Sequence, residues 1–598
     1  MNAPVIRLAL EIYLLMALTF TMASAVENGV IINHSFKDGA ELIGLDLSNL
    51  GLERANLNRS DMQRCNLNGT NLKGANLIGA VMSNAWLIKA SLTEANMEEA
   101  CLQESDLSFA NLRGANLVLS DLFGTNLTGA DLTGAKLQQA IISEAKLVGA
   151  KLDSANLVAS DLNSSDLTDA SLIGAYLERA ELGNALMVRA NITGAVLVGT
   201  NLIGANLSGA DLEGSDLSEA RIYEAKFIGS NMSKSNVIFA NLTSTNLSRS
   251  DLSNSIIKGS SFSHSDLSYV DLRDADMEDA EMHEAKLVEA KLNRANATGI
   301  CMEKADLTRA DLSDAILEDA KMEGAKLLEA KLNGADVTEV CLKDADLRGA
   351  NLTKTRLVGA NLASSNMKGL NMSRANAISA KMSWADLSGS YLSESQLSRV
   401  EFYGTNLSGA DLSKADLARA YMMRANLTRA VLNNADLTYA DLTSAKLIEA
   451  NLDDAKIYGT CLNDADLTGA FLEGATLQGL NLVGTNFGSA KLEGANLQGP
   501  MLIQDVNLSK SSLKDSRLEL ILLKNVSLEG ADLRNADLSM VMMINVDLSG
   551  ANLEHIKYDE FTLQNLINSK LNKTNMSEDL KKDLDRLRSQ AIGQSKER

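Results

Sequence analysis

The sequence is poor in the residues from which most catalytic and metal sites are built. Its 598 residues include only 4 histidines and 5 cysteines. The histidines stand far apart, and none has cysteine, serine or aspartate at a spacing that builds a metal site or a catalytic triad. Glycine-rich phosphate loops and dinucleotide fingerprints are missing as well. We therefore expect no enzyme, no cofactor and no metal.

Proline, aromatic residues and positive charge are also scarce. The chain has 2 prolines, 4% aromatic residues and a net charge of −21. Nucleic acids and anionic membranes require clustered lysine and arginine, so this charge argues against a general binder of either. Protein is the expected partner, with glycans as a second class. Trp86 and Trp384 fall at outward positions of the pattern described next, where a lone aromatic side chain is weak support for such a contact.

What the sequence does contain is one five-residue phrase repeated along its length, as in GANLSGADLEGSDLSEA. In steps of five from Leu42, the central position is almost always apolar as far as Leu502, which makes about 93 phrases. A small residue lies two positions upstream. Neither the spacing of an amphipathic helix nor the alternation of a strand fits this period. It indicates a chain that forms a short edge and then turns, with the central and small residues inside.

The outward residues predict how many edges make one turn. If four phrases form a turn, residues 20 apart are neighbours in adjacent turns. Charges complement one another at that spacing, since opposite charges on adjacent strands stabilise a sheet and like charges destabilise it. Two columns show this: Lys226, Asn246, Asp266, Lys286, Asp306, Lys326 and Asp346, and then Asp271, Lys291, Asp311 and Lys331.

Segments such as ANLSGADLEGSDLSEA and GADLTGAKLQQA resemble the pentapeptide-repeat family, with its pattern A-(D/N)-L-x-x. The resemblance covers residues 40–554. It implies an all-β fold, a right-handed quadrilateral β-helix (a solenoid) with four pentapeptides per coil, here about 26 coils. In this family a C-terminal helix can also mediate dimerisation, which the resemblance permits here.

The first residues differ in composition from the repeat. Residues 1–25 resemble a signal peptide, because an apolar stretch follows Arg7 and ends in the small-x-small sequence Ala23-Ser24-Ala25. A stable membrane span is not expected, since it takes about 20 apolar residues. The alternative is a retained helix that caps the first coil. Residues 26–39 are β-prone and form an N-terminal edge segment.

The other end of the repeat has its own features. One extra residue shifts the register near 500–507. Residues 555–598 form a C-terminal helical cap and tail, because Ser577 is a good N-cap and acidic residues follow it in the first turn. Leu580, Leu584 and Leu587 fall on one face of that helix.

Two sets of outward residues are candidate modification sites. Asn-x-Ser/Thr triplets are candidates for N-glycosylation in an exported protein. The alternative is that the family's own pattern generates them. On the repeat they are Asn126, Asn191, Asn206, Asn231, Asn241, Asn246, Asn296, Asn351, Asn371, Asn406 and Asn426.

Four cysteines are related by multiples of 20 residues and so share one face: Cys101, Cys301, Cys341 and Cys461. Cys301 and Cys341 would be two coils apart, about 9.6 Å, which is beyond the roughly 7 Å Cα separation that a disulfide allows. Exposed thiols could link neighbouring molecules in an oxidising compartment, whereas a tolerated small residue is the simpler interpretation. Cys65 takes an inward position and is expected to be inert.

Two functions follow as hypotheses. The first is a non-enzymatic structural scaffold: an exported, extracellular or cell-surface rod, glycosylated and assembled head-to-tail into a fibre or matrix. The alternative is an intracellular, cytoplasmic protein-interaction rod, including a DNA mimic that binds DNA gyrase as quinolone-resistance members of the family do. Duplex DNA carries one charge per about 1.7 Å, so a rod of about 125 Å would need roughly 70 charges. The net charge of −21 falls far short of that.

Overall fold

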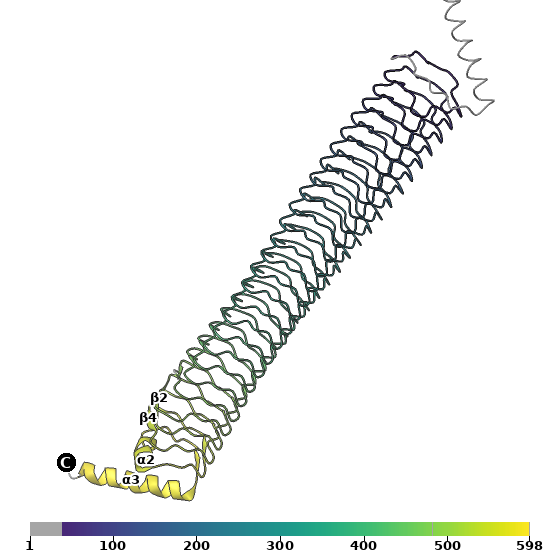
Figure 1. Ribbon diagram of the computed structural model, residues 1–598. Coiled ribbons are helices and arrows are strands. Elements are labelled where there is room, and N and C mark those ends of the chain that lie inside the picture. Colours follow the sequence, from purple (N-terminus) through teal and green to yellow (C-terminus); the bar gives the residue numbers. More distant parts are fainter. Residues whose placement is uncertain (1–38, 481, 597–598) are drawn as a thin grey trace, which may run out of the picture. The chain divides into compact units, whose positions relative to one another are not determined.

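The computed structural model describes residues 39–480 and 482–596. The chain divides into two compact units, Met1–Ala285 and Lys286–Arg598, and each is described by itself. The signal peptide expected in residues 1–25 and most of the edge segment expected in 26–39 lie outside the described residues. Within each unit the chain winds in coils that stack on one another (Figure 1).

One phrase of the first unit shows how the five residues are used. Leu112 and Ala115 are fully buried, whereas Arg113 is exposed between them. Burial of one leucine side chain contributes about 1.5–3 kcal/mol, so repetition of this arrangement supplies most of the driving force for folding. Ala297 and Ala377 are buried in the same way, so they take the central position with a shorter side chain.

Backbone hydrogen bonds join each coil to the next. The N–H of Leu112 donates to the carbonyl of Asp131 at 2.7 Å, and the N–H of Gly114 donates to Thr133 at 3.0 Å. The parallel bridge between Asn111 and Asp131 has a register of 20 residues, as do the other bridges of the first unit. One turn of the chain therefore comprises four phrases.

The corner between two edges requires an unusual backbone conformation. A hydrogen bond from the N–H of Ala115 to the carbonyl of Leu112, 3.0 Å long, closes the turn. Gly114 has a φ of 63°, in the left-handed region that glycine adopts at little cost. Glu94 has a φ of 58° at the equivalent position one coil earlier. The hydrogen bonds between coils therefore also hold residues other than glycine in the left-handed conformation.

Inward hydroxyl groups do not leave unsatisfied polar atoms in the core. Ser60 Oγ donates to the carbonyl of Leu57 in its own turn, and Thr70 Oγ1 donates to Leu47 of the previous coil, both at 2.7 Å. Cys65 is buried at the same kind of position, as the sequence predicts. Burial raises the pKa of the Cys65 thiol, which lowers its reactivity as a nucleophile.

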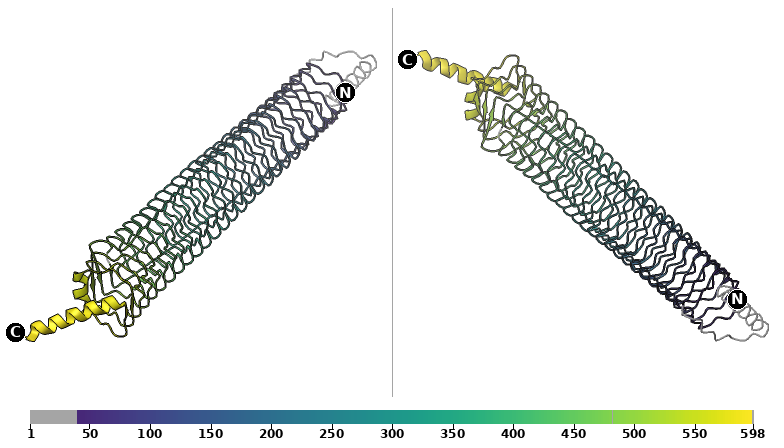
Figure 2. Two further views of the ribbon diagram at one scale, coloured as in Figure 1. Left: turned by 90° about the horizontal axis from the view of Figure 1, so that it is seen from below. Right: turned by 90° about the horizontal axis from the view of Figure 1, so that it is seen from above.

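The second unit repeats this geometry and adds regular elements near its end (Figures 1 and 2). Strands β1 to β4 form one parallel sheet in chain order, and β5 pairs with β6. The elements are β1 (Leu482–Val483), β2 (Met501–Gln504), β3 (Ile521–Lys524), β4 (Met542–Ile544), β5 (Asn552–Leu553), α2 (Glu560–Leu566), β6 (Asn575–Met576) and α3 (Glu578–Lys596).

The extra residue lies just before Ile503. Thr476 pairs with Asn496 at a register of 20, whereas Leu482 pairs with Ile503 at a register of 21. Ile503 is buried and Leu502 is 40% exposed. The five-residue count to Leu502 as a central residue was therefore wrong, because the added residue moves the inward position to Ile503.

Helix α2, which the sequence did not predict, covers the outer edge of β4. It begins after Asp559, whose carboxylate accepts a hydrogen bond from the N–H of Thr562 at 2.8 Å. Asp559, Thr562 and Asn565 accept hydrogen bonds from the N–H groups of Met540, Val541 and Met543, at 2.9, 3.1 and 3.2 Å. An unpaired strand edge would otherwise invite pairing with another chain.

Helix α3 packs against α2 and the segment before it. Leu580 and Leu584 are buried, and Leu587, the third leucine expected on that face, is half-buried. Tyr558 donates its hydroxyl proton to the Asp583 carboxylate at 2.9 Å. Burial and this hydrogen bond raise the pKa of Tyr558 to about 12.

Candidate interaction surfaces

Complementary charges stand next to one another along the outward columns. In the second unit Lys286 bridges to Asp306, Asp306 to Lys326 and Lys326 to Asp346. The Nζ of Lys326 lies 3.8 Å from the Asp306 carboxylate, and both side chains are solvent-exposed enough that the pair contributes little stability. The alternation of positive and negative charges therefore indicates the 20-residue register, whereas its contribution to the free energy of folding is small.

The carboxylates of Asp251 and Asp271 stand next to each other in one outward column, and Asp271 is paired with an arginine. The two residues are bridge partners in adjacent coils. The guanidinium group of Arg273 donates to both oxygens of Asp271, with Nε–Oδ1 at 2.8 Å and Nη2–Oδ2 at 2.6 Å. Across the described residues no group of three or more histidine, cysteine, aspartate or glutamate side chains could hold a metal ion.

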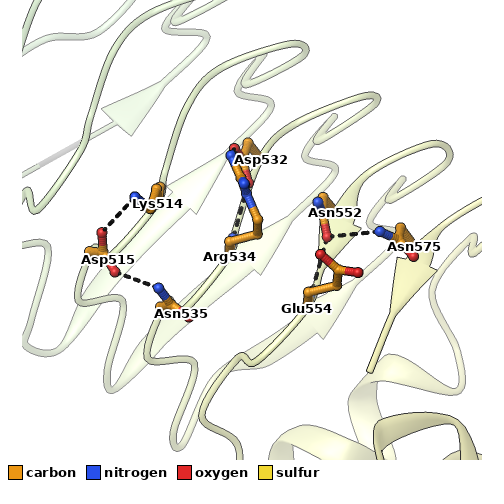
Figure 3. Close-up of polar contacts among 8 residues, drawn as sticks. All are labelled: Lys514, Asp515, Asp532, Arg534, Asn535, Asn552, Glu554 and Asn575. Atoms are coloured by element: carbon orange, nitrogen blue, oxygen red, sulfur yellow. Dashed lines mark hydrogen bonds and ion pairs between the residues drawn. The ribbon is translucent and has the colours of Figure 1, made fainter. Parts of the chain in front are cut away.

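A polar face runs along the last coils of the second unit (Figure 3). The Arg534 guanidinium group donates to both carboxylate oxygens of Asp532, and Asn535 Nδ2 donates to Asp515 in the previous coil at 2.8 Å. Asn575 Nδ2 donates to Asn552 Oδ1 at 3.4 Å. These side chains satisfy one another within the molecule, so this face has few polar groups left to bind a partner.

The asparagines of the eleven predicted glycosylation triplets have a structural role in the turn. Each Oδ1 accepts a hydrogen bond from the backbone N–H two residues later, as in Asn191 with Thr193 at 3.1 Å. In several, the Thr or Ser hydroxyl donates to the same oxygen, at 2.6 Å in Thr193. Asn126 Nδ2 also donates to Asp106 at 3.0 Å. Turn geometry therefore accounts for the triplets without a glycan.

The outward cysteines lie as the 20-residue register predicts. Cys301 and Cys341 both bridge to Lys321, one from each side, so two coils separate them. No disulfide joins any two of the five described cysteines. Cys101 Sγ lies 3.2 Å from Ser83 Oγ, and Cys461 Sγ lies 3.3 Å from Thr443 Oγ1. All four outward thiols are half-buried.

Two pairs of aromatic side chains pack edge-on at the surface of the second unit. Trp384 is 61% exposed, and its ring packs edge-on against Tyr403 with centroids 5.2 Å apart. Arg424, in the next coil, lies over the Tyr403 ring at 5.9 Å. Tyr439 and Tyr458 form a second edge-on pair at 5.5 Å.

The most unusual surface is an apolar face that the sequence analysis missed. It surrounds a shallow depression of about 380 Å³ over β2, β3, β4 and α2. Leu520 and Met540 are each 50% exposed. Contiguous exposed apolar side chains of this kind mark interaction surfaces. The outward residues of this apolar face are Pro500, Leu502, Leu520, Leu522, Met540, Met542 and Phe561.

A signal for this apolar face is present in the sequence. The segments PMLIQ, LILLK and MVMMI are apolar at outward as well as inward positions, and they recur at spacings of 20 residues. The five-residue count followed only the central positions, so it did not register these side chains. The polar face of Figure 3 lies half a turn further along the chain, since Asp532 follows Leu522 by ten residues.

The described residues contain no helix with the length and apolar character that a membrane crossing needs. No curated protein sequence matches the chain.

Three solved structures are similar to this chain. HetL, a pentapeptide repeat protein involved in heterocyst differentiation regulation from Nostoc sp. strain PCC 7120, is 28% identical over 44% of this chain and 89% of its own, with a TM-score of 0.15. QnrB1, a plasmid-mediated fluoroquinolone resistance protein, is 14% identical over 37% and 96%, with a TM-score of 0.18. A protein of the Arabidopsis thaliana thylakoid lumen is 28% identical over 19% and 68%, with a TM-score of 0.09.

The family model gives the decisive comparison, because these TM-scores are too low to carry an argument. The model described as pentapeptide repeats matches sixteen segments that together span well over half of the chain. They are 38–74, 65–103, 100–139, 130–169, 145–184, 185–222, 195–233, 220–259, 255–294, 305–344, 341–376, 380–419, 425–464, 460–499, 503–539 and 521–557. Members of this family are in general structural or interaction proteins rather than enzymes. The chain belongs to the pentapeptide repeat family, and its fold is a right-handed β-helix.

Proposed function

We propose that the protein is a non-enzymatic scaffold that binds protein molecules on its outward faces, and that a second copy of the chain occupies its apolar face. The single observation that carries this proposal is the apolar face itself. Elsewhere outward positions are mainly polar, whereas here seven apolar side chains surround one depression. Contiguous exposed apolar patches mark interaction sites more often than chance.

A second copy fits this face because its centre holds no charge. Two identical patches related by a two-fold axis can meet without desolvating an ion. Lys524 ends strand β3 and pairs with Gln504, which Asp505 follows in the chain, so residues of both signs of charge stand at the end of these strands. Stable interfaces bury about 800 Å² on each partner. Such an interface takes about 20–30 residues a side, whereas the apolar face has seven outward residues, so we expect a dimer with a dissociation constant on the order of micromolar.

Sedimentation equilibrium of the full chain tests this dimer with matched variants. Leu520→Glu places a charge in the apolar face and is expected to weaken association at least tenfold, which corresponds to about 1.4 kcal/mol. Leu119→Glu is its control, because Leu119 is 47% exposed and has a φ of 58°, against 50% and 64° for Leu520. A monomer at every concentration, or equal effects of the two variants, contradicts the proposal.

We also propose that the protein is a four-sided solenoid of about 26 coils, with α3 as a cap on its C-terminal end. The packing of α3 against α2 through Leu580 and Leu584 supports the cap. Removal of residues 577–598 is then expected to expose this end and lower the thermal midpoint of unfolding. An unchanged midpoint contradicts the cap.

We also propose that the protein is exported after cleavage of residues 1–25. It would then carry glycans on the outward triplets and assemble head-to-tail into an extracellular fibre. N-terminal sequencing of the native protein is expected to begin at Val26, and a start at Met1 or Asn2 contradicts export. Intact mass tests the glycans. Electron microscopy that shows only separate particles contradicts the fibre.

The alternative function, mimicry of duplex DNA on DNA gyrase, has less support. Lysines alternate with aspartates along the second unit, as in Asp306, Lys326 and Asp346, whereas a duplex offers uninterrupted negative charge. A gyrase supercoiling assay distinguishes the two functions. The scaffold proposal expects no inhibition at micromolar protein, and strong inhibition would favour the mimic.

A further inference from the structure

Two outward corners and the face between them gather aromatic and arginine side chains in the middle of the second unit. We call this the aromatic–arginine face and define it by Trp384, Tyr403, Arg419, Tyr421, Arg424 and Tyr439. In one coil the residues from Arg419 to Arg424 supply the centre of the cluster, with Tyr421 between the two arginines and 52% exposed. Trp, Tyr and Arg are the residues most enriched where interfaces gain their binding energy.

Adjacent coils hold these residues in one place. The backbone N–H of Trp384 donates to the backbone carbonyl of Tyr403 at 2.9 Å, so the two residues lie in neighbouring coils. The N–H of Gly404 donates to Met423 at 3.0 Å in the coil after that. Arg419 and Tyr439 occupy the same corner one coil apart. From Trp384 to Tyr439 the cluster covers just under three coils, so it extends about 13 Å along the stack.

The aromatic rings are fixed before any partner arrives. The ring of Trp384 lies over Gly404, since a Cβ built on that glycine would come within 2.6 Å of Trp384 Cε3. Tyr439 lies over Gly459 in the same way, at 2.5 Å from Cε1. Both rings thus lie along the surface and expose one face. Rigid aromatic surfaces bind with a small loss of conformational entropy.

The arginines provide the charge that selects a partner. Within the part of the chain that the structure describes, Arg419 and Arg424 form no ion pair, and the guanidinium group of Arg424 lies over the Tyr403 ring. Arg429, on the next face, is instead neutralised by Glu449 at 2.7 Å. The bridge partners of Tyr421 are Glu401 and Asp441, so the unpaired positive charge is at the two corners, where both guanidinium groups are available to a carboxylate.

From this geometry we infer that the aromatic–arginine face binds an acidic protein segment in extended conformation, with carboxylates on the arginines and apolar or aromatic side chains against the rings. The inference names a partner class for the scaffold proposed above but uses a different surface from its apolar face. A strand rises about 3.3 Å per residue, so about four residues match the length of the cluster, about 13 Å. A DNA duplex is disfavoured, because it carries one negative charge per about 1.7 Å and two guanidinium groups would neutralise only a small part of it.

Selection of a random peptide library displayed on phage against the full chain tests the inference. The expected peptides are enriched in Asp and Glu together with Leu or aromatic residues. Their binding, measured by fluorescence anisotropy of the synthetic peptide, is expected to fall at least tenfold in the double variant Arg419→Glu/Arg424→Glu. Trp384→Ala is expected to weaken binding at least fivefold.

A matched control separates this site from general charge effects. Arg59→Glu/Arg64→Glu changes the same charges at the same corner position, five residues apart and with φ values of 53° and 55°, in the first unit. It is expected to leave peptide binding unchanged. Basic selected peptides, equal loss in both double variants, or tighter binding of heparin or of a 20-base-pair duplex at this face would overturn the inference.

Self-association provides the remaining test. If Arg419→Glu/Arg424→Glu abolishes a dimer that Leu520→Glu leaves intact, the occupant is a second copy and the assignment of an acidic partner is wrong. If Leu520→Glu abolishes the dimer and peptide binding survives in it, the two sites are separate, as inferred. If the wild-type protein does not dimerise, the peptide-binding measurement alone tests the aromatic–arginine face.

Discussion

A single buried charge in the repeat should be far more damaging than a charge reversal one residue away. Leu212 is fully buried, and its N–H donates to Asn231 in the next coil at 2.6 Å. Leu212→Asp removes the leucine from the core, which costs about 2–5 kcal/mol, and buries a carboxylate without a partner, which adds several kcal/mol. The total is comparable with the stability of a single domain, about 5–15 kcal/mol.

The neighbouring residue provides the matched control. Glu213 is solvent-accessible, and its carboxylate pairs with Lys234 at 2.7 Å. Glu213→Lys breaks this surface ion pair, which costs about 1 kcal/mol or less. Repeat proteins are held together by nearest-neighbour contacts, so the damage from Leu212→Asp should be concentrated in the adjacent coils rather than spread evenly.

Hydrogen exchange followed by mass spectrometry measures this directly. In Leu212→Asp we expect lost amide protection over residues 187–236, whereas Glu213→Lys should retain the protection of the wild-type protein. Leu212→Ala should lie between them, since it leaves a cavity but no charge. Equal protection patterns in Leu212→Asp and Glu213→Lys would refute the assignment of Leu212 to the core.

Two further predictions concern the corners and the charged columns. Gly404→Ala should destabilise the protein by about 1–3 kcal/mol more than Gly409→Ala, because both glycines have a φ of 65° but only the first Cβ would meet a ring, that of Trp384; equal denaturation midpoints would contradict the packing of that ring. Burial raises the pKa of Asp537, but the Lys557 ammonium at 2.6 Å and hydrogen bonds outweigh it and lower the pKa to about 2. Stability from this carboxylate is therefore present above the ordinary aspartate pKa of about 3.9 and lost as pH falls through about 2. The free-energy difference between the wild type and Asp537→Asn should shrink between pH 5 and pH 2, and a constant difference would rule out the pKa shift.

The repeat could be predicted from the sequence because its inward positions follow one strict apolar period. Leucine at every fifth residue leaves the chain a single way to bury its side chains, and outward charges at Lys326 and Asp346 report the 20-residue register. The inward placement of Cys65 followed from the same count. Local pattern was sufficient because each coil contacts only its neighbours.

The outward surfaces could not be predicted in the same way. Trp384, Tyr403 and Arg424 are far apart in the sequence and meet only after the chain is arranged in rows of 20 residues. The inward shift to Ile503 depends on where one extra residue is absorbed, which a count of five cannot locate. Helix α2 is short, and its place is determined by the edge of β4 that it covers. The position of the aromatic and arginine side chains, the shift to Ile503 and the place of α2 all depend on contacts between residues far apart in the sequence.

The 20-residue register is the central claim of this account, and a cysteine placed between two native ones tests it most directly. Lys321→Cys introduces a thiol next to Cys301 on one side and Cys341 on the other, with Cα atoms about 4.8 Å apart, inside the range that a disulfide allows. Mild oxidation of the monomeric protein, followed by peptide mapping, is expected to show a disulfide from the introduced thiol to one of these cysteines. Ile316→Cys, which the register puts on another face, is expected to form none. A disulfide in Ile316→Cys and none in Lys321→Cys would contradict the register.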